Sequence, residues 1–148
     1  MYRVTKTYGH ERGLSACFRQ WRADHSHCSL LHGYSLSVEL VFESSVLDHR
    51  NWVIDFGGVD WIKNYLERTF DHKTLVAADD PEFSTFESLD RAGIIDMIPV
   101  KRTGCESFSQ MVFEHIRITL AKIGFDNAVR IVSVKIAEHG SNSATYIG

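Results

Sequence analysis

The sequence contains only three cysteines and two prolines, and it has no long apolar run. An odd number of cysteines makes a disulfide framework unexpected, so Cys17, Cys28 and Cys105 should be free thiols. No stretch approaches the ~20 apolar residues of a membrane helix, and the first residues, MYRVTKTYGHERG, contain no apolar segment of a signal peptide. No linker or repeat divides the chain, so we expect a single domain over residues 1–148, located in the cytoplasm.

The sequence also has no large excess of positive or of negative side chains. The chain has 16 Lys and Arg residues against 19 Asp and Glu residues, which gives a formal charge of −3. This balance argues against nucleic acid or an anionic membrane as the main partner, and it leaves room only for a local basic pocket that binds phosphate. The length of 148 residues and the hydrophobic content of 44% suit a globular protein with a sizeable core.

Alternating apolar and polar residues predict strands with one buried face. In the stretch GLSACFRQW, the apolar side carries Leu14, Ala16 and Phe18, and in YSLSVELVF apolar residues alternate with serine and glutamate. The predicted strands are 13–21, 34–42 and 128–138, with a further apolar run at 51–56 and a short terminal strand at 144–148.

Two helices are predicted from apolar residues at helical spacing. The first covers residues 57–70. The second begins at TGCE, where Thr103 as N-cap and Glu106 at N3 form a capping-box pattern. The long connection 71–102 contains one more candidate for a short helix, which Gly93 would close.

The order of strands, helix, long connection, helix and strands predicts an α+β domain. We expect two helices on one face of a mainly antiparallel sheet. Such a sheet has free edges, which favour closure into an oligomer.

The stretch HSHCSLLH, residues 25–32, contains three histidines and a cysteine. His32 and Tyr34 stand two residues apart at the start of a strand, so their side chains leave the same face. Cys17 would reach that face if the two predicted strands pair, and with His32 it would then offer a thiolate and an imidazole to zinc. Zinc needs three or four such ligands, so these residues alone do not decide between a metal site and a polar loop.

Cys28 and the pair Asp71–His72 are candidates for acid–base chemistry. Cys28 lies in a polar loop beside His25 and His27, and a partly exposed thiol next to an imidazolium becomes reactive because its pKa falls. The alternative is a small, inert loop residue. Asp71 and His72 are the residue types that hold and polarise a proton carrier, although Asp71 would equally end a helix and leave His72 in solvent.

Two glutamates are candidates for ligand binding. Glu138 follows the apolar residues of the last long strand, where its carboxylate is either solvated or accepts hydrogen bonds from the N–H groups of a ligand. Glu106 has a complete structural explanation in the predicted capping box, so any binding role would be additional.

Five motifs in this order resemble one family. They are CSLLHGY (28–34), VIDFGGV (53–59), FDH (70–72), CES (105–107) and VSVKIAEH (132–139). Together they resemble the 6-pyruvoyltetrahydropterin synthase and 6-carboxytetrahydropterin synthase family of the tunnelling fold. That family has a cysteine before H-G-H, then V-x-D-F, L-D-H, P-T-x-E and a strand ending in Glu. The resemblance covers roughly residues 10–148.

The resemblance implies a fold, an assembly and a reaction. The fold would be a four-stranded antiparallel sheet with two helices on one face, assembled as a homohexamer of two trimers with active sites between subunits. The reaction would be a lyase step on 7,8-dihydroneopterin triphosphate, in which zinc grips the side-chain hydroxyls, a thiol moves a proton and triphosphate is eliminated. In the carboxy-forming branch, which feeds queuosine synthesis, acetaldehyde leaves as well.

The resemblance also implies residue roles. Cys28 would be the catalytic thiol, Asp71 and His72 its proton relay, and Glu138 the residue that holds the pterin ring by its N–H edge. Glu106 would bind substrate as the Glu of P-T-x-E, in which Gly104 stands where the family has Thr.

The metal positions depart from the family. Its zinc is held by a histidine of the first strand and by both histidines of H-G-H, and we assign these positions to Cys17, His32 and Tyr34. His32 and Cys17 are therefore the predicted zinc ligands, since a phenol of pKa ~10 is a poor donor at neutral pH, and His25 or His27 would be the substitutes. Three functions stay open: a pterin-forming lyase with an altered metal site, a homologue that binds a pterin or purine-like ligand without zinc or turnover, and a structural oligomer in which Cys28 is unreactive.

Overall fold

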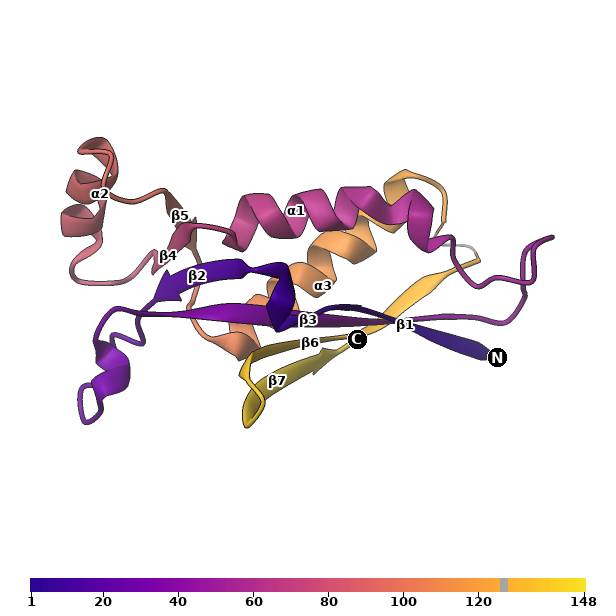
Figure 1. Cartoon of the computed structure of the whole chain (residues 1–148), viewed down its shortest axis with the longest axis horizontal. Helices are drawn as coiled ribbons and strands as arrows, with labels where there is room; N and C mark the ends of the chain where they lie inside the picture. The colour runs from indigo at the N-terminus through magenta and orange to yellow at the C-terminus, as the bar shows by residue number, and fades with distance from the viewer. Residues whose placement is uncertain (126–127) are drawn as a thin grey trace.

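The computed structural model describes residues 1–125 and 128–148. Within these residues the chain forms a mixed sheet of seven strands and three α-helices (Figure 1). The strands are β1 (Tyr2–Tyr8), β2 (Leu14–Phe18), β3 (His32–Ser44), β4 (Lys73–Ala77), β5 (Met97–Val100), β6 (Arg130–His139) and β7 (Asn142–Ile147). The helices are α1 (Asp60–Phe70), α2 (Phe83–Arg91) and α3 (Cys105–Lys122).

The sheet is organised around β3, which has 13 residues and pairs along both of its edges. One edge pairs antiparallel with β2 and, further along, with β1, while the other edge pairs antiparallel with β6. Strand β7 continues the antiparallel order beyond β6, whereas β4 and β5 add to β2 in parallel. The strand order is β5-β4-β2-β3-β6-β7, with β1 beside β3.

The structure confirms the α+β class and corrects its details. The sheet has seven strands rather than four and is mixed rather than antiparallel throughout. The difference arises because the connection 71–102 is not a long loop: it contains β4, α2 and β5, and Gly93 ends the α2 region with φ of 73°. The apolar run 51–56 is not a strand, because it contains bends followed by the start of the 3-10 helix Phe56–Val59.

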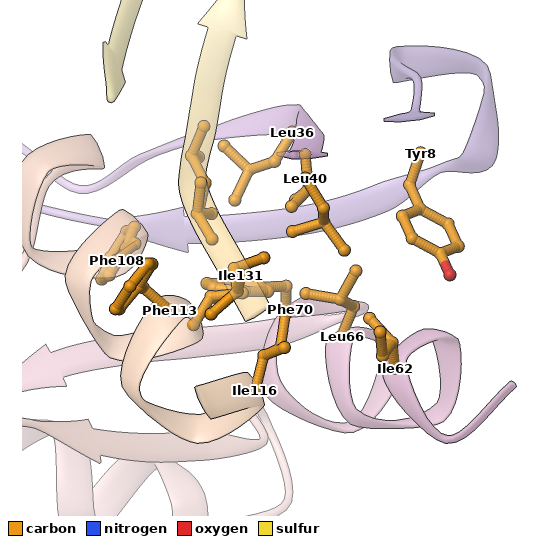
Figure 2. Close-up of a cluster of buried hydrophobic side chains, with 14 of the residues drawn as sticks. Tyr8, Leu36, Leu40, Ile62, Leu66, Phe70, Phe108, Phe113, Ile116 and Ile131 are labelled. Atoms are coloured by element: carbon orange, nitrogen blue, oxygen red, sulfur yellow. The ribbon is translucent and has the colours of Figure 1, made fainter. Parts of the chain in front are cut away.

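Helices α1 and α3 pack on one face of the sheet, as the sequence predicts (Figure 1). The buried side chains between these layers come from β3 and β6 on one side and from both helices on the other (Figure 2). Phe108 of α3 contacts Phe18 of β2 and Phe70 of α1 edge-on, with ring centroids 5.0 and 5.6 Å apart. Within the described residues, no helix is both long and apolar enough to cross a membrane.

We predict that Phe42→Ala lowers the free energy of unfolding by about 3–5 kcal/mol, because the Phe42 side chain is completely buried and its removal leaves a cavity beneath β3. Phe125→Ala is the matched control, since the Phe125 side chain is exposed and its loss should cost well under about 1 kcal/mol. Urea denaturation of both variants measures the difference. Equal stabilities would contradict the assignment of Phe42 to the core.

Candidate functional site

The pairing of β2 with β3 places three side chains on one face of the sheet. Phe18 pairs with His32, and Ala16 pairs with Tyr34. Paired residues of antiparallel strands point to the same face, so Phe18, His32 and Tyr34 lie together on the side of the helices. Their rings form a cluster in which the centroid of His32 lies 5.9 Å from that of Phe18 and 5.3 Å from that of Tyr34.

Cys17 lies on the other face. It pairs with Gly33, and its Sγ lies 3.1 Å from Oγ1 of Thr74 on β4. The expectation that Cys17 shares a face with His32 is therefore wrong, although the two strands do pair. The reason is the two-residue period of a strand, which puts Phe18 rather than Cys17 beside His32.

The residues present do not fit a zinc ion. Residues 1–125 and 128–148 contain no group of three or more His, Cys, Asp or Glu side chains arranged to hold a metal, and the exposed His25 and His27 complete none. On the face of His32, Phe18 has no donor atom, and burial together with the charge of Glu138 raises the pKa of the Tyr34 phenol. A protonated phenol and a phenyl ring leave a single imidazole, which is too few ligands for zinc.

We predict that the double variant Phe18→His, Tyr34→His gains a zinc site, because three imidazoles would then lie on one face at adjacent positions. Elemental analysis should find about one zinc ion per chain in this variant and far less in the parent protein. The control, Cys17→His with Tyr34→His, puts the first new imidazole on the opposite face and should bind no zinc. Stoichiometric zinc in the parent protein would overturn our conclusion about the metal.

Glu138 lies near Tyr34 at the end of β6. It is half-buried, and it follows Val134 and Ile136, whose side chains point toward the helices. The pairing of β6 with β7 is irregular between Ala137 and His139, so no residue of β7 is paired with Glu138. The preceding residue, Ala137, pairs with Ser37 of β3, and the charge of Glu138 helps to raise the pKa of both Tyr34 and Cys105.

Cys105 is the first residue of α3, and its thiol is buried beside Glu138. Burial, with smaller contributions from the charges of Glu138 and Glu106, raises the pKa of the Cys105 thiol to about 12. Its thiolate is therefore scarce at neutral pH. Cys105 forms a wall of this region and is not a nucleophile.

We predict that iodoacetamide at pH 7.5 modifies Cys28 and Cys17 but spares Cys105, because the first two side chains are partly exposed and the third is buried with a raised pKa. Mass spectrometry of peptides measures each site separately. Labelling in denaturant is the control and should modify all three residues. Rapid modification of Cys105 in the folded protein would contradict the burial of this thiol.

The start of α3 differs from the predicted capping box. Its N-cap is Gly104 with φ of 111°, and no side chain caps it. The Thr103 hydroxyl instead donates to the carbonyl oxygen of Arg19 at 2.7 Å, so Thr103 joins α3 to the end of β2. Glu106 is thus not held in a cap: it is exposed in the first turn of α3, where a negative charge suits the helix dipole.

Cys28 lies in the loop between β2 and β3, inside the 3-10 helix His27–Ser29. Its backbone N–H donates to Oγ of Ser26 at 3.2 Å, and its carbonyl accepts from the N–H of Gln20 at 2.9 Å. This loop leads directly into His32 and Tyr34 at the start of β3, and the Cys28 side chain is partly exposed. The predicted thiol and the predicted pterin-binding glutamate therefore lie at the same end of the sheet, where β3 begins and β6 ends.

Asp71 and His72 form the predicted pair, with 2.7 Å between Nδ1 of His72 and Oδ1 of Asp71. The His72 side chain is 86% exposed, and its φ of 57° allows its N–H to donate to the carbonyl of Ser15. His72 shares a cavity of about 440 Å³ with Cys17. Within one chain, this pair lies with Cys17 rather than with Tyr34 and Glu138, and so it is not joined to Cys28.

Comparison with known proteins identifies the family of this chain. The family model described as 6-pyruvoyl tetrahydropterin synthase matches residues 8–148. The chain belongs to this family. A 6-carboxy-5,6,7,8-tetrahydropterin synthase of Aquifex aeolicus is 24% identical over 121 residues, which cover 80% of this chain and 75% of the relative.

Solved structures show the same fold. An uncharacterized protein from Wolinella succinogenes superposes with a TM-score of 0.82 at 20% identity, covering 99% of this chain and 98% of the other. The 6-pyruvoyl tetrahydropterin synthase of Plasmodium vivax has a TM-score of 0.69 at 14% identity, with the same coverage. The fold of the 6-pyruvoyl tetrahydropterin synthase family therefore extends over almost the whole chain.

Sequence reasoning missed two residues of this site. Phe18 occupies the place beside His32, and the alternation of Leu14, Ala16 and Phe18 already carried that signal. Asp80 is buried and forms an ion pair with Arg19, at the start of the loop between β2 and β3 that contains Cys28. No local pattern in the sequence indicates this contact.

Proposed function

We propose that this chain binds a pterin-type ring, without zinc, on the face formed by Tyr34, Glu138 and the start of α3. The observation that carries the proposal is the register of β2 and β3, which sets Phe18 beside His32 and turns Cys17 away. Membership of a tetrahydropterin synthase family supports the ligand class. Phe18 and the protonated Tyr34 offer no ligand to zinc, which argues against a zinc ion on this face.

The chemistry of the face suits a flat ring with N–H groups at one edge. A half-buried carboxylate such as that of Glu138 accepts hydrogen bonds from these groups, and such bonds are stronger than neutral ones because the acceptor is charged. Glu106 offers a second carboxylate from the first turn of α3. The partly exposed ring of Tyr34, whose centroid lies 6.2 Å from that of the buried Phe18, provides apolar surface for the ring plane.

The second candidate is a lyase acting on 7,8-dihydroneopterin triphosphate, with Cys28 as the thiol and Asp71–His72 as the proton relay. Its support is the contact of 2.7 Å between Asp71 and His72, together with the relative named a 6-carboxy-5,6,7,8-tetrahydropterin synthase. Because Cys28 and His72 are apart within one chain, this reaction requires His72 of a second copy. Strands β1 and β7 each pair with a single neighbour, and such open edges favour the homohexamer that we propose for this case.

We predict that chelator-treated protein binds 7,8-dihydroneopterin and that Glu138→Gln weakens this binding about 10- to 100-fold, because a charged acceptor is lost. Isothermal titration calorimetry measures both affinities. Glu87→Gln is the control, since Glu87 lies on α2 and pairs with Arg91 at the surface. Equal affinities of the parent and Glu138→Gln would exclude Glu138 as the ring-binding residue.

Turnover separates the two candidates. Triphosphate release from 7,8-dihydroneopterin triphosphate is measured with the protein as purified, with the protein after addition of zinc, and with Cys28→Ser. Binding without release supports the first proposal. Release that is absent in Cys28→Ser supports the lyase, and sedimentation should then show an oligomer.

A further inference from the structure

The geometry points to Arg19 and Asp80 as a positioning pair that holds the Cys28 loop, residues 19–31, against the pterin face. The inference rests on the proposed function only in taking this loop as a wall of the ligand site. It adds that this loop is held in position by Asp80, which lies in the segment between β4 and α2. Neither Arg19 nor Asp80 is proposed to contact the ligand.

The contact between Arg19 and Asp80 is bidentate. Nε of Arg19 donates to Oδ2 of Asp80 at 2.8 Å, and Nη2 donates to Oδ1 at 2.6 Å. A guanidinium and a carboxylate joined by two parallel hydrogen bonds are fixed in orientation as well as in distance. The Arg19 side chain cannot then turn without breaking both bonds.

Asp80 is suited to be the fixed partner. Its side chain is only 2% exposed, and Oδ1 also accepts the backbone N–H of Glu82 at 2.8 Å, just before α2. The hydrogen bond from Arg19 lowers the pKa of Asp80, so the carboxylate is charged at neutral pH. Removing Arg19 would leave the buried carboxylate of Asp80 without a compensating charge.

Arg19 and its neighbour hold the backbone at Cys28. Nη1 of Arg19 donates to the carbonyl of Ser29 at 3.4 Å, and the N–H of Gln20 donates to the carbonyl of Cys28 at 2.9 Å. Two consecutive carbonyls of the Cys28 loop are thus bound to two consecutive residues at the end of β2. The position of Arg19 therefore sets the position of the Cys28 backbone.

The same residue is joined to α3. The carbonyl of Arg19 accepts the Thr103 hydroxyl, two residues before Cys105, and a Cβ at Gly104 would lie 2.4 Å from Nε2 of Gln20. Gln20 thus packs closely on the glycine that begins α3. Arg19 and Gln20 link the Cys28 loop, the start of α2 and the start of α3, which borders the pterin face.

The Cys28 loop has little regular structure to hold it otherwise. Its internal backbone bonds are turns, such as Ala23 N–H to the Gln20 carbonyl and Ser26 N–H to the Ala23 carbonyl, and its only helix is the single turn His27–Ser29. A segment of this kind opens easily unless it is fixed at its ends. Its shape therefore depends on the contacts of Arg19 and Gln20.

Asp79 provides a matched control beside Asp80. It accepts hydrogen bonds from Arg22 and Trp21 at 3.1 and 3.2 Å, but the Arg22 and Asp79 side chains are 74% and 53% exposed. Exposed ion pairs contribute little. Asp79→Asn removes an adjacent carboxylate of the same segment and should leave the Cys28 loop in place.

The test is the rate of iodoacetamide alkylation at Cys28, measured by peptide mass spectrometry in the parent, Asp80→Asn, Arg19→Gln, Arg19→Lys and Asp79→Asn. We expect Asp80→Asn and Arg19→Gln to raise the rate about tenfold, the factor for losing one charge-assisted hydrogen bond. Arg19→Lys keeps the positive charge but cannot form the two parallel hydrogen bonds, so it should raise the Cys28 alkylation rate by a smaller factor. Asp79→Asn should match the parent.

Cys17 is the internal reference, because it lies on the opposite face of β2 and bonds to Thr74. A purely structural loss would raise alkylation of Cys17 and Cys28 together, and this result would overturn the inference. An unchanged Cys28 rate in Asp80→Asn, or an equal rise in Asp79→Asn, would overturn it too. If Asp80→Asn and Arg19→Gln fail to fold, Arg19→Lys decides: a rise at Cys28 alone supports the pair, and no rise contradicts it.

A second measurement separates this inference from the proposed function. If 7,8-dihydroneopterin slows alkylation of Cys28 in the parent, the loop borders the ligand site, and Asp80→Asn should lose most of that protection. If the pterin has no effect in the parent while Asp80→Asn still raises the Cys28 rate selectively, the pair positions the loop and the proposed ligand is wrong.

Discussion

The pairing of β3 along both edges is the constraint on which the rest of the structure depends. Its 13 residues meet β2 and β1 on one side and β6 on the other. Because side chains alternate across a strand, the register of these pairs decides which residues reach the helices and which face away. The same register that buries Leu36, Val38 and Leu40 in the core also places His32 and Tyr34 at the end of that buried row.

The candidate site is thus a continuation of the core rather than a separate structure. Phe18 is completely buried against Phe108 and at the same time forms one side of the cluster with His32 and Tyr34. A phenyl ring at this place packs well and coordinates nothing. Because the inward residue of β2 beside His32 is an aromatic ring without a donor atom, Glu138 is the half-buried carboxylate that this face offers to a ligand.

Buried carboxylates join segments that are far apart in the sequence at two places in the chain. Glu43, at the end of β3, accepts hydrogen bonds from Arg3 of β1 and Arg130 of β6 at 2.8 and 2.6 Å, and these bonds lower its pKa. Arg19 and Asp80 do the same between the Cys28 loop and the segment before α2. In both cases a buried carboxylate meets guanidinium groups from segments far apart in the sequence, so neither is visible in a local pattern.

The sequence by itself determined the α+β class, the two long helices, the family, and the antiparallel strands other than β1, because these follow from periodicity and from motifs within short stretches. The alternation of apolar and polar residues in β2 also predicts that Phe18 lies on the buried side. The position beside His32 could therefore have been assigned to Phe18, rather than to Cys17, from the sequence alone. Only the tertiary structure decided that residues 71–102 form β4, α2 and β5, since short parallel strands depend on β2 for their partners. It also decided that Thr103 binds Arg19 instead of capping α3, and that Asp71–His72 lies away from Cys28, because both depend on contacts between residues distant in the chain.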